Sequence, residues 1–250
     1  MSPALIRIEN LRCGYGERIV LDQINFEVFA GEVVAILGGS GCGKSTLMKH
    51  MIGLYDPMSG RVEIGGDDLA SASGALRERI LRRFGVMYQS GALFGSMTVL
   101  DNVRLPLESF SNLDDESIEL VARLKLRLVG LEDFASFLPS ELSGGMQKRA
   151  AIARAMSLDP AILFLDEPSA GLDPVTSAEL DALIRRLTEI QGMTIVVVTH
   201  ELASINAIAD RAVMLDRDAK GIIAIGSPAE LARHEDIRVR RFFLREAETP

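Results

Sequence analysis

A glycine-rich segment followed by Lys, Ser and Thr points most directly to a chemistry. It follows the apolar run Val33–Leu37 and matches the pattern G-x-x-x-x-G-K-[ST], in which backbone N–H groups at a helix N-terminus converge on phosphate oxygens. We expect Lys44 to reach the β- and γ-phosphates and the Ser45 hydroxyl to bind Mg²⁺. The alternative is a tight strand-to-helix turn without a ligand. The predicted nucleotide-phosphate site comprises Gly38, Gly39, Ser40, Gly41, Cys42, Gly43, Lys44, Ser45 and Thr46.

Two adjacent carboxylates close another apolar run, Ala161–Leu165. Asp166 at the end of a strand can enter the shell of a Mg²⁺ ion, and Glu167, which points differently, can orient an attacking water. Two carboxylates at a strand end are also found in ordinary solvated turns. Together with the phosphate loop, they favour hydrolysis of a nucleotide.

A Ser-Gly-Gly segment distinguishes among the many proteins with phosphate loops, which include kinases, GTPases and motor ATPases. The sequence from Leu142 to Gln147 reads LSGGMQ and resembles the LSGGQ signature of ATP-binding-cassette (ABC) ATPases, with Met146 as the one departure. Such a turn opens a helix, here expected from Met146 to Met156, whose N–H groups and dipole can hold a phosphate. The resemblance implies that two copies sandwich two ATP molecules, with Ser143, Gly144 and Gly145 facing the partner's nucleotide.

The same resemblance implies roles for further residues. Tyr15 resembles the aromatic residue that stacks on adenine, although it could instead pack against the early strands. Gln89 resembles the glutamine that senses Mg²⁺ and the γ-phosphate, and His200 resembles the switch histidine that contacts the γ-phosphate. Asp173 lies in a segment similar to the loop that crosses the dimer interface. The implied catalytic residues are Glu167, His200, Gln89 and Lys44, and the implied Mg²⁺ ligands are Ser45, Gln89 and Asp166.

The elements that must position these residues alternate strands with helices. Polar and apolar residues alternate through residues 6–11 and 24–28, which predicts half-buried antiparallel strands. The runs Val33–Leu37, Ala161–Leu165 and Ile195–Val198 are apolar throughout, as in a parallel sheet covered on both faces. The fold class is therefore α/β. The resemblance implies a P-loop NTPase of the ABC ATPase type, with a RecA-like parallel-sheet core, an antiparallel β subdomain and an inserted helical subdomain.

The predicted domain is residues 1–236, with the helical subdomain at about 96–159 and a C-terminal extension at 237–250. The helix-period segments Glu116–Leu128 and Gln147–Ser157 define the insertion. A hairpin around Asp218–Gly221 precedes a short helix that is capped at Ser227. The extension mixes arginines with Phe242 and Phe243, and it either docks on a second cassette or a regulatory subunit or packs on its own domain.

The composition excludes several classes of protein. The 250 residues include 27 Lys and Arg against 35 Asp and Glu, and a net charge of -8 argues against a nucleic-acid partner. Cys13 and Cys42 have no metal-ligand spacing. They provide no disulfide framework, which fits a reducing cytoplasm. We expect no signal peptide, and no apolar run approaches the roughly 18 to 20 residues of a spanning helix. A cassette of this kind would need separate permease subunits.

The stretch from Gln89 to Leu107, together with Ser143–Met146, resembles the ATPases of Mla-type phospholipid transporters. This resemblance implies a permease, an MCE-domain lipid-binding protein and a small regulatory subunit, with the ATPase on the cytoplasmic face of the bacterial inner membrane. Cassettes for amino acids or lipoproteins share much of the pattern, so another solute stays open, as does a soluble ABC ATPase without a transport role. Leu93, Phe94 and Met97 either contact the permease or pack into the helical subdomain.

Overall fold

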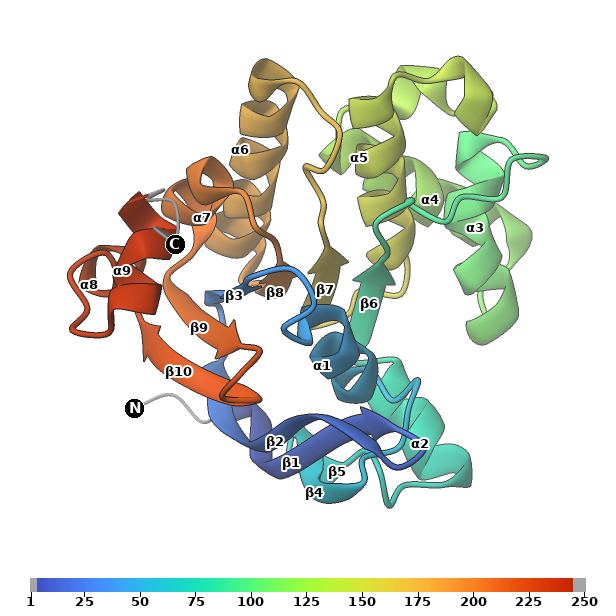
Figure 1. Cartoon of the computed structure of the whole chain (residues 1–250). Helices are drawn as coiled ribbons and strands as arrows, with labels where there is room; N and C mark the ends of the chain where they lie inside the picture. Colours follow the sequence, from blue (N-terminus) through green and yellow to red (C-terminus); the bar gives the residue numbers. More distant parts are fainter. Residues whose placement is uncertain (1–3, 245–250) are drawn as a thin grey trace. The chain divides into compact units, whose positions relative to one another are not determined.

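The computed structural model describes residues 4–244, which form two compact units. The first unit consists of the chain up to Leu81 and from Thr194 onward, and the second runs from Arg82 to Met193. Figure 1 shows the helices and strands of both. Within residues 4–244, no helix has the length and apolar character needed to cross a membrane.

An antiparallel sheet forms one part of the first unit. The long strands β1 (Ala4–Tyr15) and β2 (Arg18–Phe29) pair with each other, and the sheet continues through β4 (Ser59–Ile64) and β5 (Asp67–Asp68) in the order β2-β1-β4-β5. The predicted alternation is confirmed, because Ile6, Ile8 and Ile24 are buried between exposed or half-buried neighbours.

Parallel strands form the other part of the first unit. Strand β3 (Val33–Gly38) lies between β8 (Thr194–Val198) and β9 (Arg211–Asp216) and runs parallel to both. Every residue of β3 and β8 is buried, as the unbroken apolar runs predict. The predicted hairpin is present, since β10 (Gly221–Gly226) pairs antiparallel with β9. The helices of this unit are α1 (Lys44–Met51), α2 (Gly74–Leu81), α7 (Leu202–Ile208), α8 (Pro228–Leu231) and α9 (Ile237–Leu244).

The second unit combines two parallel strands with four α-helices among its described elements. Strands β6 (Phe84–Met87) and β7 (Ile162–Asp166) pair in register from Phe84 opposite Ile162 to Met87 opposite Leu165. The helices are α3 (Val99–Phe110), α4 (Asp115–Leu128), α5 (Gly144–Ala155) and α6 (Pro174–Gln191). Helix α4 matches its prediction, whereas α5 begins before the predicted Gln147 or Met146 because Ser143 caps it.

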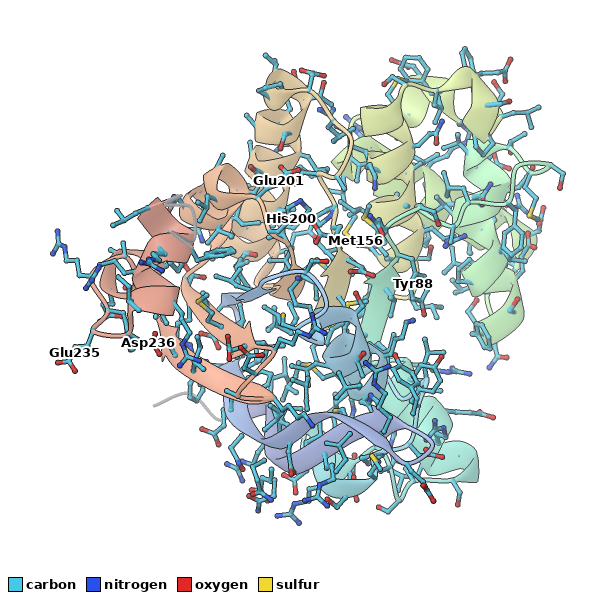
Figure 2. All side chains as sticks on the ribbon, viewed as in Figure 1. Tyr88, Met156, His200, Glu201, Glu235 and Asp236 are labelled. Atoms are coloured by element: carbon cyan, nitrogen blue, oxygen red, sulfur yellow. The ribbon has the colours of Figure 1, made fainter. Side chains whose placement is uncertain are left out.

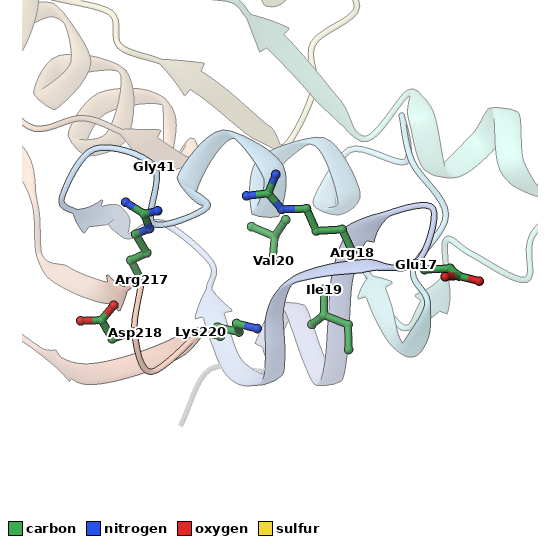
Figure 3. A pocket seen from close by; sticks show the side chains of 8 residues that line it. All are labelled: Glu17, Arg18, Ile19, Val20, Gly41, Arg217, Asp218 and Lys220. Carbon is green, nitrogen blue, oxygen red and sulfur yellow. The ribbon is translucent and has the colours of Figure 1, made fainter.

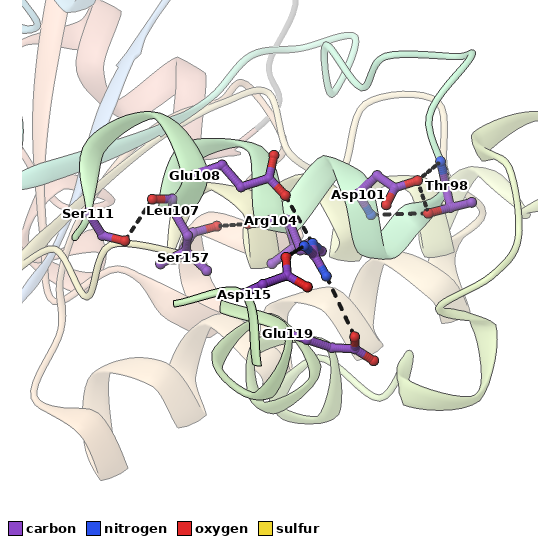
Figure 4. Close-up of polar contacts among 10 residues, drawn as sticks. Thr98, Asp101, Arg104, Leu107, Glu108, Ser111, Asp115, Glu119 and Ser157 are labelled. Atoms are coloured by element: carbon purple, nitrogen blue, oxygen red, sulfur yellow. Dashed lines mark hydrogen bonds and ion pairs between the residues drawn. The ribbon is translucent and has the colours of Figure 1, made fainter. Parts of the chain in front are cut away.

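Side-chain contacts fix the start of helix α3 and connect the helix to α4 (Figure 4). Thr98 and Asp101 form a capping box at its start, and Arg104 donates to Glu108 at 3.0 Å and also pairs with Asp115 of α4. The side chain of Asn102, which is fully buried, bonds to both backbone groups of Phe94 at 2.8 and 3.1 Å. These contacts order the segment that leads from β6 into the helices. The boundaries predicted for a helical subdomain and a C-terminal extension stay a prediction.

Candidate nucleotide site

The phosphate loop joins β3 to α1 in the first unit. Gly43 caps α1 with φ 105°, a conformation that favours glycine, and it offers no side chain to the N–H groups of the first turn. A Cβ at this position would also lie 2.9 Å from Leu21 Cγ. Lys44 Nζ donates to the carbonyl oxygens of Gly38 at 2.9 Å and Gly39 at 3.2 Å, so its ammonium lies against the loop. A glycine-built helix start with a lysine beside it fits an anionic phosphate chain.

A pocket of about 310 Å³ opens beside this loop. It is lined by Tyr15, Arg18, Val20, Gly41, Gly43, Lys44, Ser45 and Thr46. The Tyr15 hydroxyl is 3.1 Å from Thr46 Oγ1, its ring meets Tyr55 edge to face at 5.4 Å, and it is 43 % exposed. The structure therefore places Tyr15 next to the phosphate loop with a large part of its side chain exposed to solvent. Such exposure is needed if the ring is to stack on a base.

A second hollow, of about 610 Å³, shares Arg18, Val20 and Gly41 with the first (Figure 3). It adds Arg217 and Lys220 from the turn between β9 and β10, together with the acidic Glu17 and Asp218. The lining thus includes three cationic side chains and two acidic ones, and this excess of positive charge favours an anionic ligand. The sequence predicts the hairpin, but it does not predict that Arg18 and the turn line one hollow, because no motif links residues about 200 positions apart.

His200 lies at the same sheet edge as the phosphate loop. Strands β3 and β8 are parallel with Ile36 opposite Val198, and Thr199 N donates to Ile36 O at 3.4 Å. His200 follows directly and is exposed (Figure 2). Its predicted place beside the loop therefore agrees with the register, while its role in the reaction stays a prediction. Cys42, within the loop, is buried, and burial raises the pKa of its thiol, so it is no reactive thiolate.

The carboxylates of the second unit lie where two parallel strands end. Because Met87 is opposite Leu165, Tyr88 and Gln89 leave β6 at the edge where Asp166 and Glu167 leave β7. The backbone of Glu167 has φ 47°, which is uncommon for a residue other than glycine and is a form of strain found at functional sites.

The oxygen donors of the chain suit Mg²⁺. Asp166 and Gln89 lie together in the second unit, and the exposed Ser45 hydroxyl lies in the first. Within the described residues, no group of three or more His, Cys, Asp or Glu side chains gathers into a metal cage. Mg²⁺ is typically held by one or two carboxylates, waters and substrate phosphates, so the oxygen donors of each unit, taken by itself, are of the kind that this ion binds.

The Ser-Gly-Gly segment opens helix α5. Ser143 is its N-cap and accepts a hydrogen bond from Met146 N at 3.3 Å. Gly145 lies so close to α6 that a Cβ there would be 2.3 Å from Thr176 Cγ2. The sequence motif thus corresponds to a helix start that another helix approaches closely.

Asp173 caps helix α6 with its carboxylate. It accepts hydrogen bonds from Val175 N at 3.0 Å, Thr176 N at 3.1 Å and Thr176 Oγ1 at 2.6 Å. These bonds, with the Thr176 hydroxyl first, lower the pKa of Asp173. The capping role is a finding, and the predicted contact of Asp173 with nucleotide stays a prediction.

Sequence reasoning missed Lys148 of helix α5. This buried lysine donates to the backbone oxygen of Gln89, and burial lowers its pKa while the charges of Asp166 and Glu167 act in the opposite direction. Only its place five residues after Ser143 could have drawn attention to it. The first unit thus brings together Tyr15, residues 38–46 and His200, and the second holds Gln89, Ser143, Gly144, Gly145, Asp166, Glu167 and Asp173.

Comparison with known proteins identifies similar chains. The family model described as ABC transporter matches residues 21–170. The intermembrane phospholipid transport system ATP-binding protein MlaF of Haemophilus influenzae is 38% identical over 250 residues, covering 100% of this chain and 94% of the relative. The probable ribonucleotide transport ATP-binding protein mkl of Mycobacterium leprae is 38% identical over 95% of this chain and 68% of the relative. A post-hydrolysis dimer of the ATP-binding cassette MJ0796 with ADP and Pi has a TM-score of 0.78 and 32% identity, covering 89% of this chain and 98% of that one.

Proposed function

This chain belongs to the ABC transporter family as an ATP-binding ATPase, and we propose that it powers a separate membrane permease that moves phospholipids. The structural observation that carries the ATPase part of this proposal is the presence of two helix starts suited to anions, α1 after the glycine-rich loop and α5 after Ser143. A phosphate loop alone serves many enzymes. The second helix start is the feature that the resemblance assigns to the partner's nucleotide.

The proposed hydrolysis works by positioning and electrostatics. Lys44 and the first-turn N–H groups of α1 hold the phosphate chain and stabilise the charge that develops on it. Glu167 orients the attacking water, and His200 contacts the γ-phosphate. Mg²⁺ held by Ser45, Gln89 and Asp166 would neutralise charge on the phosphate oxygens. The assignment of these residues to one reaction rests on the family resemblance.

We place a second copy of the chain across the nucleotide. The related cassette MJ0796 was solved as a dimer with ADP and Pi, which supports the same arrangement here. In this dimer, Ser143 of the partner subunit, at the start of its α5, would complete the contacts to the γ-phosphate. The dimer would close when ATP binds and reopen after hydrolysis. These two states of the dimer would then drive two conformations of the permease.

The proposed permease contact lies in the second unit around Phe94. The Phe94 side chain is 51 % exposed, whereas Leu93 and Met97 are half-buried, so Phe94 is the strongest candidate of the three. A groove of about 190 Å³ in the same unit adds apolar surface from Phe84, Val86, Pro106, Phe110, Leu158 and Pro160. The mutant Phe94→Glu should lose permease association while retaining ATP hydrolysis by the isolated chain. Unchanged association and transport would exclude this contact.

Phospholipid as the cargo is supported by the full-length similarity to a phospholipid transport ATPase. We therefore propose as further partners an MCE-domain lipid-binding protein and a small regulatory subunit, and as location the cytoplasmic face of the bacterial inner membrane. The net charge of -8 agrees with the absence of a nucleic-acid partner from this scheme.

The experiment that tests this proposal is purification of the tagged chain from detergent-solubilised membranes, followed by identification of its partners. A multi-span permease together with an MCE-domain protein is the expected result. If no membrane protein is recovered, the transport role is wrong and a soluble ABC ATPase replaces it.

A different solute is the second candidate, because an equally identical relative carries the name of a ribonucleotide transport protein. The ATPase mechanism would be unchanged under this alternative. Recovery of a permease with another type of solute-binding partner, in place of the MCE-domain protein, would favour it.

A further inference from the structure

Helix α5 covers the segment that follows strand β6, which we call the glutamine loop (residues 89–94). One face of the helix carries Lys148, Ala151 and Arg154, three residues apart, as neighbours on a helix surface must be. Lys148 Nζ donates to the backbone oxygen of Gln89. Arg154 donates to the backbone oxygens of Ala92 at 2.6 Å and Gly91 at 3.3 Å.

Two further contacts join this face of α5 to the glutamine loop without a hydrogen bond. A Cβ at Gly91 would lie 3.5 Å from Ala151 Cβ, and the Arg154 guanidinium lies 5.9 Å from the centre of the Phe94 ring. The loop is therefore attached to α5 at its beginning through Lys148 and along its later part through Arg154. The helix that starts at Ser143 and the loop that contains Gln89 form one connected body.

The position of Lys148 is costly unless its charge is balanced. Its side chain is only 9 % exposed, and an ammonium removed from water needs hydrogen-bond acceptors or opposite charges nearby. The Gln89 carbonyl supplies the acceptor, and Asp166 and Glu167 supply negative charge. Tyr88, which precedes Gln89 (Figure 2), also interacts electrostatically with Asp166. Lys148 therefore lies near the residues that follow strands β6 and β7.

We propose that Lys148 is a positioning residue of the ATPase site, which ties the glutamine loop to helix α5 and holds Gln89 in register with Asp166 and Glu167. This inference rests on the proposed ATP hydrolysis. The lysine need not touch nucleotide, because it acts through the backbone of Gln89. Replacing it should therefore impair turnover much more than binding.

The test compares Lys148→Met, which keeps the apolar stem, with Lys148→Arg, which keeps the charge and the donors. Loss of one hydrogen bond from a charged donor predicts a rise of about tenfold in amide hydrogen exchange of residues 89–92 in the nucleotide-free full chain. We expect kcat for ATP to fall by a similar factor, of about tenfold, in Lys148→Met, with nucleotide affinity changed by less than about twofold. Lys148→Arg should restore both values.

Lys125→Met is the matched control, since Lys125 is the other buried lysine of the described second unit and pairs with Asp159. It should lower the thermal midpoint without changing exchange in the glutamine loop. If Lys148→Met does not fold, Lys148→Gln takes its place with the same measurements.

The proposal is overturned if exchange of residues 89–92 is unchanged, or if Lys148→Arg is as impaired as the neutral variants. Absence of ATPase activity in the unmodified chain would be a different result, because it would remove the proposed function itself.

Discussion

The phosphate loop of the first unit and the carboxylate edge of the second are built by different means. The loop depends on backbone conformation, since Gly43 with φ 105° caps α1 and Lys44 lies against the carbonyls of its own loop. At the carboxylate edge, strands β6 and β7 set the register and side chains of α5 hold the segment that follows.

This difference has a functional meaning. A loop built from local backbone geometry can bind phosphate in the same way throughout a catalytic cycle. A loop held by the side chains of a helix should move when that helix moves, so under the proposed function we expect the carboxylate edge to be the region that couples hydrolysis with a conformational change. The two regions should accordingly respond to mutation in different ways, binding in the first and turnover in the second.

Glu167→Gln should give the largest effect and separates the two regions most clearly. The amide keeps the size of the side chain but cannot act as a carboxylate toward water, so turnover should fall by about a thousandfold. ATP affinity should stay within about twofold, because binding depends on the phosphate loop. Steady-state hydrolysis and binding of a fluorescent ATP analogue measure the two quantities.

The control is Glu189→Gln, which alters an exposed carboxylate paired with Arg185 in helix α6. Its turnover should match that of the unmodified chain. Preserved hydrolysis in Glu167→Gln would show that another group orients the water.

The contrast between the regions also explains what the sequence could predict. The phosphate loop, the buried strands and the β9–β10 hairpin were foreseen because glycine positions and apolar runs report local conformation. The contacts of Lys148 and Arg154 were not, since their partners lie about 60 residues away. The positive φ of Glu167 could not be foreseen either, because tertiary structure imposes it on a residue that does not favour it.

Lys44→Ala should show the opposite pattern to Glu167→Gln, with loss of binding. Removal of a charged donor to the phosphates should weaken ATP affinity by about 10- to 100-fold. Lys49→Ala is the control, because Lys49 lies on the same helix with its amine 5.9 Å from the Tyr55 ring. Calorimetric titration with ATP measures the affinity of both variants. Undiminished affinity in Lys44→Ala would contradict the phosphate-binding role of the loop.

Gly145→Ala tests the close approach of α6 to the start of α5. The added Cβ would lie 2.3 Å from Thr176 Cγ2, so overpacking should lower the free energy of unfolding by about 1 to 3 kcal/mol. Thr176→Ser removes that methyl group and keeps the hydroxyl that donates to Asp173. The double mutant should therefore regain most of the loss in denaturant unfolding. Equal stability of the single and double mutants would mean that another contact is responsible.

Replacement of Tyr15 should have the smallest effect of these changes. Two variants distinguish the contribution of its ring from that of its hydroxyl. Tyr15→Leu removes a stacking surface and should weaken ATP binding by about fivefold to tenfold, at the lower end of the range for base stacking on an aromatic ring. Affinity for inorganic tripolyphosphate, which has no base, should not change. Tyr15→Phe loses only the 3.1 Å contact with Thr46 Oγ1 and should bind ATP within about threefold of the unmodified chain. If Tyr15→Leu weakened ATP and tripolyphosphate equally, Tyr15 would support the loop instead of the base, and Val20 would be the better candidate for contact with adenine.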